Sequence, residues 1–158
     1  MRPLVTPLIR IQREDFELSD EIAALSHGRA DIGAVVSFTG LCRDENGMLS
    51  ALEIEHYPGM AEAEIARVAA EAAARWPLIG LVAIHRFGLI RPGEQIVLVL
   101  AASTHRRDAF EAADLMMDYL KTRAPFWKRE HRADGTLGGW VEAKAGDDDA
   151  AKRWEQAP

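Results

Sequence analysis

Two lysines, Lys121 and Lys128, lie on either side of Pro125, where a predicted helix ends and the chain restarts as a strand. Such a sharp break allows both amines to point into one cleft. Two ammonium groups held close together disfavour each other's protonation, and partial burial acts in the same direction. One lysine can then serve as an acid, a base or a nucleophile near neutral pH. The alternative is a pair of surface lysines at a helix C-terminus, where the helix dipole favours cations.

His105 and Arg106 lie at the predicted start of the same helix. The free N–H groups and the positive end of a helix N-terminus suit an anion such as phosphate, which indicates an anion-binding position. In the other interpretation, Arg106 and Arg107 simply pair with Asp108 or Glu111 on the helix surface. The sequence by itself leaves both interpretations open.

Arg43 follows a predicted strand at the mouth of a loop that contains Gly and Asn, a common place for binding residues on a rigid frame. Phe38 and Met117 can line the flat face of an aromatic ligand, although such residues at strand or helix spacing are usually part of a core. Cys42 is interpreted as structural, because a lone cysteine at a strand end usually behaves as a small buried hydrophobe.

Charge is distributed unevenly along the chain. The formal net charge is −6, but the stretch from Lys121 to Arg132 holds five Lys or Arg against one acid. A compact basic site on an acidic body suggests a small anionic ligand or an acidic peptide tail. The acidic total argues against a protein that coats long nucleic acid.

Composition limits the remaining classes. With 158 residues, 48% of them hydrophobic, the chain is expected to form a single domain over 1–158. The scattered His56, His85 and His131 lack the spacing of a metal site, so neither a metal nor a cofactor is predicted. The sequence contains neither a long apolar run nor a signal peptide, which favours a cytoplasmic protein with no membrane partner.

Periodicity predicts an α+β domain in which antiparallel hairpins are covered by two main helices. The main helices are expected over Met60–Trp76 and from a Ser103 or Thr104 cap to Arg123, and a shorter one from a Ser19 or Asp20 cap to Leu25. The second main helix has Phe110, Ala113, Met117 and Leu120 as its predicted buried stripe. A short terminal helix is expected after Asp147.

Strands are predicted between these helices. Their ranges are Ile32–Thr39, Ala51–Tyr57, Leu81–Ile90, Gln95–Ser103, Phe126–Arg132 and Leu137–Ala143. Asn46-Gly47 is expected to turn the first two into a hairpin, because both residues tolerate positive φ. The turn at 91–94 is expected to join the next two into a second hairpin.

Several stretches together resemble the large subunit of molybdopterin synthase. They are Phe-Thr-Gly-Leu-Cys-Arg (38–43), Leu-Glu-Ile-Glu-His-Tyr-Pro-Gly-Met (52–60), Ile-His-Arg-Phe-Gly (84–88), Met-Asp-Tyr-Leu-Lys-Thr-Arg-Ala-Pro-Phe-Trp-Lys-Arg-Glu (117–130) and Trp-Val-Glu-Ala (140–143). The long stretch through Pro125 is the most specific of them. The stretches occur in the family's order and cover most of the chain from Gly33 to Trp154.

The resemblance implies an α/β hammerhead-type domain that forms a homodimer, with a ubiquitin-like small sulfur-carrier subunit at each end of a heterotetramer. The thiocarboxylate at the carrier's C-terminal Gly-Gly would hand sulfur to cyclic pyranopterin monophosphate, and two transfers would form the dithiolene of molybdopterin. The resemblance places the family's catalytic lysines on Lys121 and Lys128. It places the substrate-binding residues on Phe38, Arg43, His105, Arg106, Met117 and, from a neighbouring subunit, Lys144.

Two other functions also fit the residues. A non-catalytic oligomeric module that binds a small anionic metabolite would explain the basic site without a reactive lysine. A small RNA-binding sheet domain would also place helices behind an antiparallel sheet, but the acidic net charge speaks against it.

Overall fold

The computed structural model describes residues 4–141 and Trp154. The helices are α1 (Leu18–Ser26), α2 (Met60–Arg75) and α3 (Arg106–Thr122). The strands are β1 (Leu8–Gln12), β2 (Ala34–Leu41), β3 (Leu49–His56), β4 (Leu78–Arg86), β5 (Gly88–Ile90), β6 (Gln95–Ser103) and β7 (Phe126–Arg132). They form two sheets, and the predicted α+β class is confirmed.

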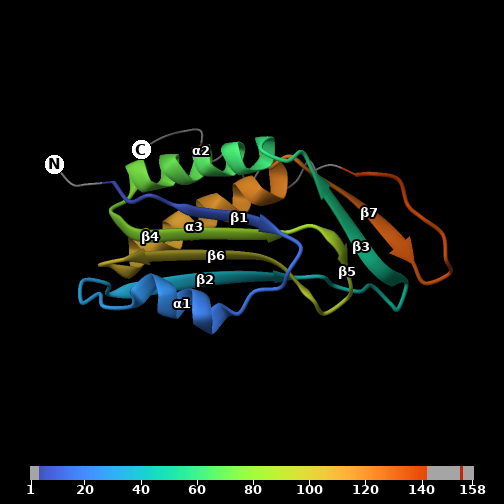
Figure 1. The fold of residues 1–158 in the computed structure, drawn as a ribbon, viewed down its shortest axis with the longest axis horizontal. Helices are drawn as coiled ribbons and strands as arrows, with labels where there is room; N and C mark the ends of the chain where they lie inside the picture. Colours follow the sequence, from blue (N-terminus) through green and yellow to red (C-terminus); the bar gives the residue numbers. More distant parts are fainter. Residues whose placement is uncertain (1–3, 142–153, 155–158) are drawn as a thin grey trace.

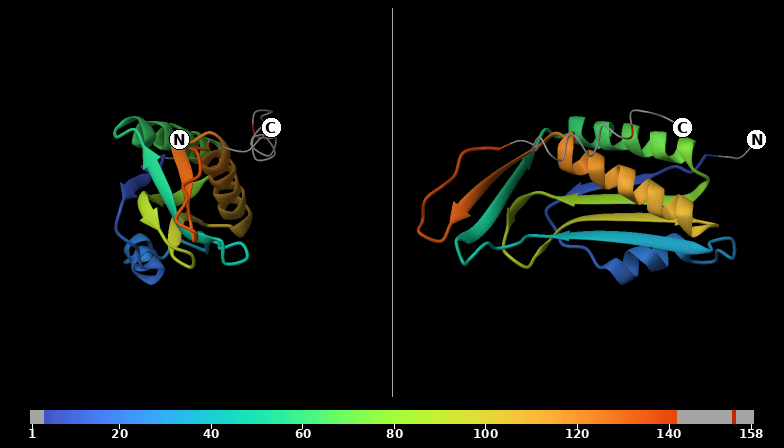
Figure 2. Two further views of the ribbon diagram at one scale, coloured as in Figure 1. Left: turned by 90° about the vertical axis from the view of Figure 1, so that its right-hand side faces the viewer. Right: turned by 180° about the vertical axis from the view of Figure 1, so that it is seen from behind.

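The larger sheet has four strands in the order β1-β4-β6-β2. Its central pair, β4 and β6, is antiparallel, while β1 runs parallel to β4 and β2 runs antiparallel to β6. Figures 1 and 2 show α2 and α3 on one face of this sheet and α1 on the other. Both faces are therefore covered, which explains why β4 and β6 are apolar along most of their length.

Strand β6 shows how the two faces are divided. Val97 and Val99 belong to the hydrophobic core beneath α2 and α3. Leu98 and Leu100 alternate with them and pack with Phe16 in a second core on the α1 side. Because side chains alternate across a strand, one apolar run serves both cores.

The smaller sheet has three strands in the order β5-β3-β7, all antiparallel. The chain enters it from the larger sheet at Gly88, whose φ is +93°. This conformation is open to glycine and strained for other residues, so Gly88 permits the bend that separates β4 from β5. The single strand predicted over Leu81–Ile90 is therefore wrong, although the predicted antiparallel pairing of its first part with β6 is confirmed.

The first predicted hairpin is also wrong. Asn46 and Gly47 do form a turn, with φ of 58° and 70°. However, β2 pairs with β6 in the larger sheet, whereas β3 pairs with β5 and β7 in the smaller one. The turn thus connects the two sheets, because a turn motif fixes a local reversal but not the strand that each arm finds as a neighbour.

Helix α3 extends as predicted, but its buried stripe differs at one residue. Ala113, Met117 and Leu120 are buried, whereas Phe110 is 60% exposed. The helix N-caps are also corrected: Glu17 precedes α1 and His105 precedes α3. The sequence reasoning missed β1 altogether, since this short segment gains its regularity by pairing with β4.

Of the last predicted strand, the structure describes residues 137–141, which form two isolated bridges, Lys128 with Val141 and His131 with Leu137. The predicted terminal helix after Asp147 lies outside the described residues. In the described part of the chain, no helix is long and apolar enough to cross a membrane.

Candidate functional site

The two candidate catalytic lysines lie at one corner of the molecule. Lys121 is in the last turn of α3 and is exposed, and Lys128 is in β7. The connection between the two elements is short and tight, because Ala124 N–H donates to the Tyr119 carbonyl across 3.2 Å. Figure 1 shows the end of α3 meeting the smaller sheet at this corner.

Lys128 faces the core between the two sheets. It is paired with Ile54, which is fully buried, so both side chains start from the inner face of the smaller sheet. The buried imidazole of His85 stacks on the Phe126 ring, with centroids 3.9 Å apart. Burial lowers the pKa of His85 to about 3, and the electrostatic influence of the nearby Lys128 and His56 acts in the same direction. His85 is therefore neutral at physiological pH.

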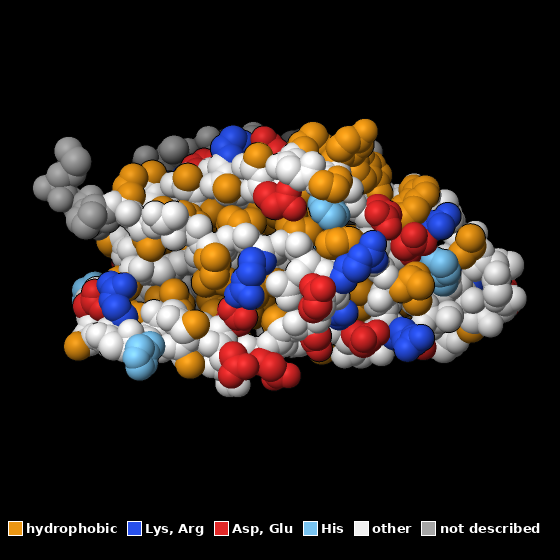
Figure 3. Space-filling view, viewed as in Figure 1, with side chains coloured by type: hydrophobic (Ala, Val, Ile, Leu, Met, Phe, Trp, Pro, Cys, Tyr) orange, Lys and Arg blue, Asp and Glu red, His pale blue; other side chains and the backbone are white. Residues whose placement is uncertain are grey.

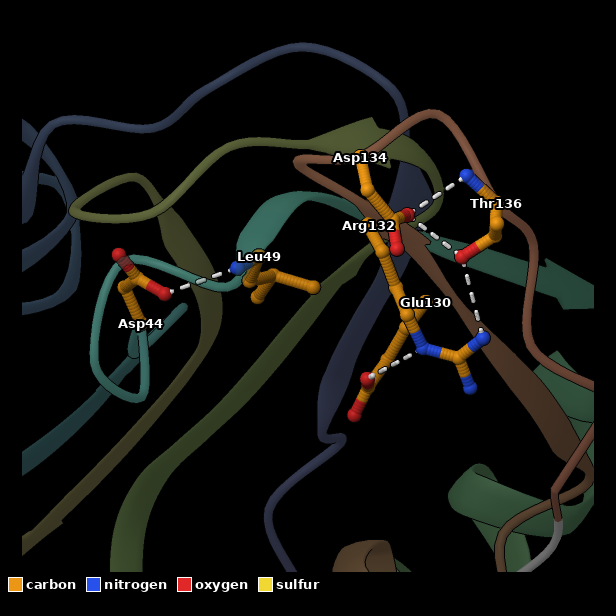
Figure 4. A network of polar contacts seen from close by, with 6 residues as sticks. All are labelled: Asp44, Leu49, Glu130, Arg132, Asp134 and Thr136. Carbon is orange, nitrogen blue, oxygen red and sulfur yellow. Dashed lines mark hydrogen bonds and ion pairs between the residues drawn. The ribbon is translucent and has the colours of Figure 1, made fainter.

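Arg43 lies at the same end of the larger sheet, directly after β2. Its side chain is 81% exposed and pairs with Glu45 across 2.7 Å. The loop that follows β2, residues 42–48, is called the Arg43 loop. It is held by a hydrogen bond in which the Asp44 carboxylate accepts from Leu49 N–H across 3.0 Å (Figure 4). Ala133 N–H also donates to the Met48 carbonyl, which ties this loop to the turn after β7.

A second ordered turn stands beside that loop in Figure 4. The Asp134 carboxylate accepts hydrogen bonds from the backbone N–H and the hydroxyl of Thr136, at 2.9 and 2.6 Å. Arg132 lies 4.0 Å from Glu130 and donates to the Thr136 hydroxyl. These bonds fix the tip of the smaller sheet next to the Arg43 loop.

An open groove of about 440 Å³ runs between β2 and α3. Phe38 and Met117 line it, as do Phe110, Glu111 and Asp114. Phe38 is partly exposed on the strand and Met117 is buried on the helix. The two candidate ligand-stacking residues are thus brought together, in a groove that lies between the two ends of α3.

The structure separates His105 and Arg106 from the lysines. His105 precedes the first residue of α3 and Lys121 lies in its last turn. At 1.5 Å per residue, the helix axis places them about 24 Å apart. Within one chain, His105 and Arg106 therefore lie at the opposite end of α3 from Lys121.

The surroundings of His105 are well defined. The Ser103 hydroxyl donates a hydrogen bond to the His105 carbonyl, and His105 and Arg106 are exposed. Arg107 lies 4.0 Å from Glu111, so of the two arginines this one forms the ion pair on the helix surface that was the alternative to anion binding.

Cys42 is buried in the core, and burial is the main cause that raises the pKa of its thiol above the ordinary value. The structural interpretation of Cys42 is therefore supported. Across residues 4–141 and Trp154, no three His, Cys, Asp or Glu side chains are grouped to hold a metal ion. Lys144 lies outside the described residues.

The sequence reasoning missed a polar cluster on the outer face of the smaller sheet. The Glu53 carboxylate accepts a hydrogen bond from Arg129 Nε and lies 2.7 Å from His131 Nε2. The hydrogen bond with His131, then that with Arg129, holds the pKa of Glu53 below its ordinary value. The alternation of the two segments indicated which side chains share a face, but only the register of β3 and β7 reveals the contact.

A family model described as MoaE protein matches residues 11–123. The chain belongs to the MoaE family. A molybdopterin synthase catalytic subunit from Mesorhizobium japonicum is 69% identical over 157 residues, which cover 99% of each chain. A relative of the same name from Brucella melitensis is 63% identical over 94% of this chain and 91% of its own length.

Solved structures agree with this family. A MoaE protein from Burkholderia ambifaria has a TM-score of 0.81 at 46% identity, covering 94% of this chain and 98% of that one. Molybdopterin synthase from Staphylococcus aureus has a TM-score of 0.73 at 29% identity, over 88% and 98% of the chains. The family and fold identified from the sequence motifs are confirmed, and the activity of this MoaE chain is the sulfur transfer of a molybdopterin synthase catalytic subunit.

Proposed function

We propose that the chain transfers two sulfurs from the thiocarboxylated tail of a small ubiquitin-like subunit to cyclic pyranopterin monophosphate, in the cytoplasm. The observation behind this assignment of roles is that Lys121 lies in the last turn of α3, Lys128 lies near the start of the strand that follows it, and Arg43 follows β2 at the same end of the larger sheet. The groove between β2 and α3 offers Phe38 and Met117 as apolar walls.

Electrostatics explains why cations are needed. The pterin phosphate and the thiocarboxylate are both anions, and their repulsion grows as water is excluded from the site. Lys128 balances the incoming tail, and Arg43 contributes to holding the substrate phosphate. Charges fixed in advance lower the barrier because they need little reorganisation during the reaction.

Lys121 carries proton transfer or stabilises the charged intermediate as sulfur leaves the acyl carbon. In this step a thioester that joins the tail to the pterin through sulfur is hydrolysed: the acyl carbon–sulfur bond breaks and water supplies the replacing oxygen. The sulfur remains on the pterin and the tail becomes a carboxylate. The proton released by water requires an acceptor close to the acyl carbon, and an exposed lysine at a helix end can pass it to solvent.

The second part of the proposal is a site completed by a second copy of the chain. His105 and Arg106 lie about 24 Å from Lys121 along the helix and so cannot reach the same phosphate within one chain. In a homodimer, His105, Arg106 and Lys144 of one copy can join the lysine corner of the other. With one small subunit on each copy, the assembly is a heterotetramer.

The test is a reconstituted reaction of the purified chain with a thiocarboxylated small subunit and cyclic pyranopterin monophosphate. Lys121→Ala should lower the turnover about 100-fold or more while the small subunit still binds. Arg107→Ala, which removes an exposed cation from the same helix, is the matched control and should change turnover less than about twofold.

Two outcomes would contradict the proposal. A wild-type chain that forms no dithiolene product with authentic partner and substrate is not acting in this role. If Lys121→Ala weakens pterin binding in proportion to one lost charge and leaves turnover of the bound substrate intact, the non-catalytic anion-binding module is the better description.

A further inference from the structure

A cluster of four rings joins the two sheets behind Lys128. His56 lies 4.5 Å from Phe87 and 6.1 Å from Phe126, measured between ring centroids. His85 stacks on the other side of Phe126 at 3.9 Å. Neither histidine has a part in the sulfur-transfer roles described above. Two buried imidazoles in an otherwise apolar contact require a reason, because a polar group costs free energy when it is buried without a partner.

His85 has its hydrogen bond within the fold. Its Nδ1 lies 2.8 Å from the Arg86 carbonyl oxygen, and a carbonyl can only accept, so Nδ1 carries the proton. The ring is neutral, as its lowered pKa requires. A neutral ring stacked on Phe126 fills the space between the sheets without adding a second positive charge near Lys128.

His56 is different. Its side chain is only 6% exposed, and Nε2 lies 3.8 Å from a carboxylate oxygen of Glu62. The other Glu62 oxygen accepts a hydrogen bond from Gly59 N–H, which holds the carboxylate at the start of α2. Within the described part of the chain, His56 Nδ1 is buried and has no hydrogen-bond partner.

Strand register places Lys128 on the same face of the smaller sheet as His56. His56 pairs with Phe126, and Lys128 pairs with Ile54, two residues away on each strand. The four side chains share the inner face, and diagonal neighbours on one face lie within reach of a long side chain. The electrostatic influence of both Lys128 and His56 on the buried His85 is a second sign that they converge on one small region.

We propose that His56 is a positioning residue for Lys128, accepting a hydrogen bond from the lysine ammonium through its unpartnered Nδ1. The proposal rests on the role given to Lys128 in sulfur transfer. With the Nε2 proton directed at Glu62, Nδ1 presents its lone pair. A neutral imidazole orients the ammonium without cancelling its charge, whereas a carboxylate in this place would neutralise the cation that has to balance an incoming anion.

Side-chain geometry supplies a matched pair of variants. In His56→Asn the amide oxygen occupies the place of Nδ1, while in His56→Gln the amide group occupies the place of Nε2. His56→Phe keeps the ring and removes the acceptor. We expect His56→Asn to retain turnover within about 3-fold of the wild type. His56→Phe and His56→Gln should lose about 10-fold or more, the scale of a hydrogen bond to a charged group.

A double-mutant cycle tests whether the effect passes through Lys128. In a Lys128→Ala background, His56→Phe should cause no further loss, because the group that it positions is already absent. Equal losses from His56→Phe in both backgrounds would overturn the proposal, and so would equal activity of the Asn and Gln variants.

A measurement on the free chain separates this proposal from the proposed function. An ammonium held by a hydrogen bond exchanges its protons with water more slowly than a solvated one, so Lys128 should give a ¹⁵N-resolved ammonium signal without partner or substrate. The signal should persist in His56→Asn and vanish in His56→Phe. Its persistence in folded His56→Phe would refute the contact, whatever the activity of the wild-type enzyme.

Discussion

The two sheets of this protein are built differently. In the larger one, β6 contributes side chains to two apolar cores, and the residues Val97–Ser103 are all buried. In the smaller one, the inner face of β3 and β7 carries the buried Ile54 and Phe126 beside His56 and Lys128, and the outer face carries the Glu53, Arg129 and His131 cluster. Arg129 also stacks over the Trp140 ring at 4.5 Å.

This difference means that the larger sheet provides most of the stability, while the smaller sheet carries the charged groups proposed to act in the reaction. Apolar burial is the dominant favourable contribution to folding and depends little on pH or salt. Charged contacts contribute less and respond to both. The larger sheet therefore provides a frame that stays fixed, and the smaller sheet carries Lys128 where charges can be arranged around an anionic substrate. Figure 3 shows exposed hydrophobic side chains gathering where α2 begins, the region of Tyr57 and Met60, at the boundary between the two sheets.

The largest expected effect comes from a cavity in the larger sheet. Leu98 is fully buried against Ile84 and Phe16 in the core on the α1 side. Leu98→Ala should lower the free energy of unfolding by about 2–5 kcal/mol, the range for deletion of a buried leucine side chain. Urea denaturation measures the loss, and Leu89→Ala, at an exposed position of β5, is the control. If Leu98→Ala lowers the free energy of unfolding by less than Glu53→Gln does in the smaller sheet, apolar burial in the larger sheet is not the dominant source of stability.

A smaller, pH-dependent effect is expected in the smaller sheet. The lowered pKa of Glu53 means that its contribution to stability is present above about pH 4.5 and is lost as the pH falls through the folded-state value. Glu53→Gln should therefore cost about 1 kcal/mol at pH 7 and converge with the wild type in acid. Thermal melts across this pH range provide the measurement.

Glu130→Gln is the control for that series. Glu130 is in the same strand as Arg129, is 61% exposed and lies 4.0 Å from Arg132. Its removal should leave the pH dependence unchanged. If the Glu53 variant instead keeps a constant offset from the wild type at every pH, the carboxylate charge is not what stabilises the outer face.

The smallest effect is expected at Phe110. This side chain is 60% exposed beside the groove, so Phe110→Ser should change the free energy of unfolding by less than about 0.5 kcal/mol. Met117→Ser, at a buried position that lines the same groove, should cost about 2 kcal/mol or more. A similar loss in the free energy of unfolding for both variants would show that exposed Phe110 contributes to packing as much as buried Met117 does.

Much of the local structure could be predicted from the sequence. Helix α2 was bounded to within a residue by its Ala- and Glu-rich periodicity and by Pro77, and β7 was located fully by its alternation and by Pro125. These are short-range effects, since backbone preference and the period of apolar residues act within a few positions. The motif from Met117 to Glu130 likewise identified the family.

The sequence determined which residues carry the chemistry, because residue type and local spacing are written in it. The tertiary structure alone decided which of them meet. It placed the arms of the Asn46-Gly47 turn in different sheets, set His56 beside the strand of Lys128, and kept His105 a helix length from Lys121. Contacts between distant segments depend on which surfaces bury most completely against one another, and this is a property of the whole folded chain.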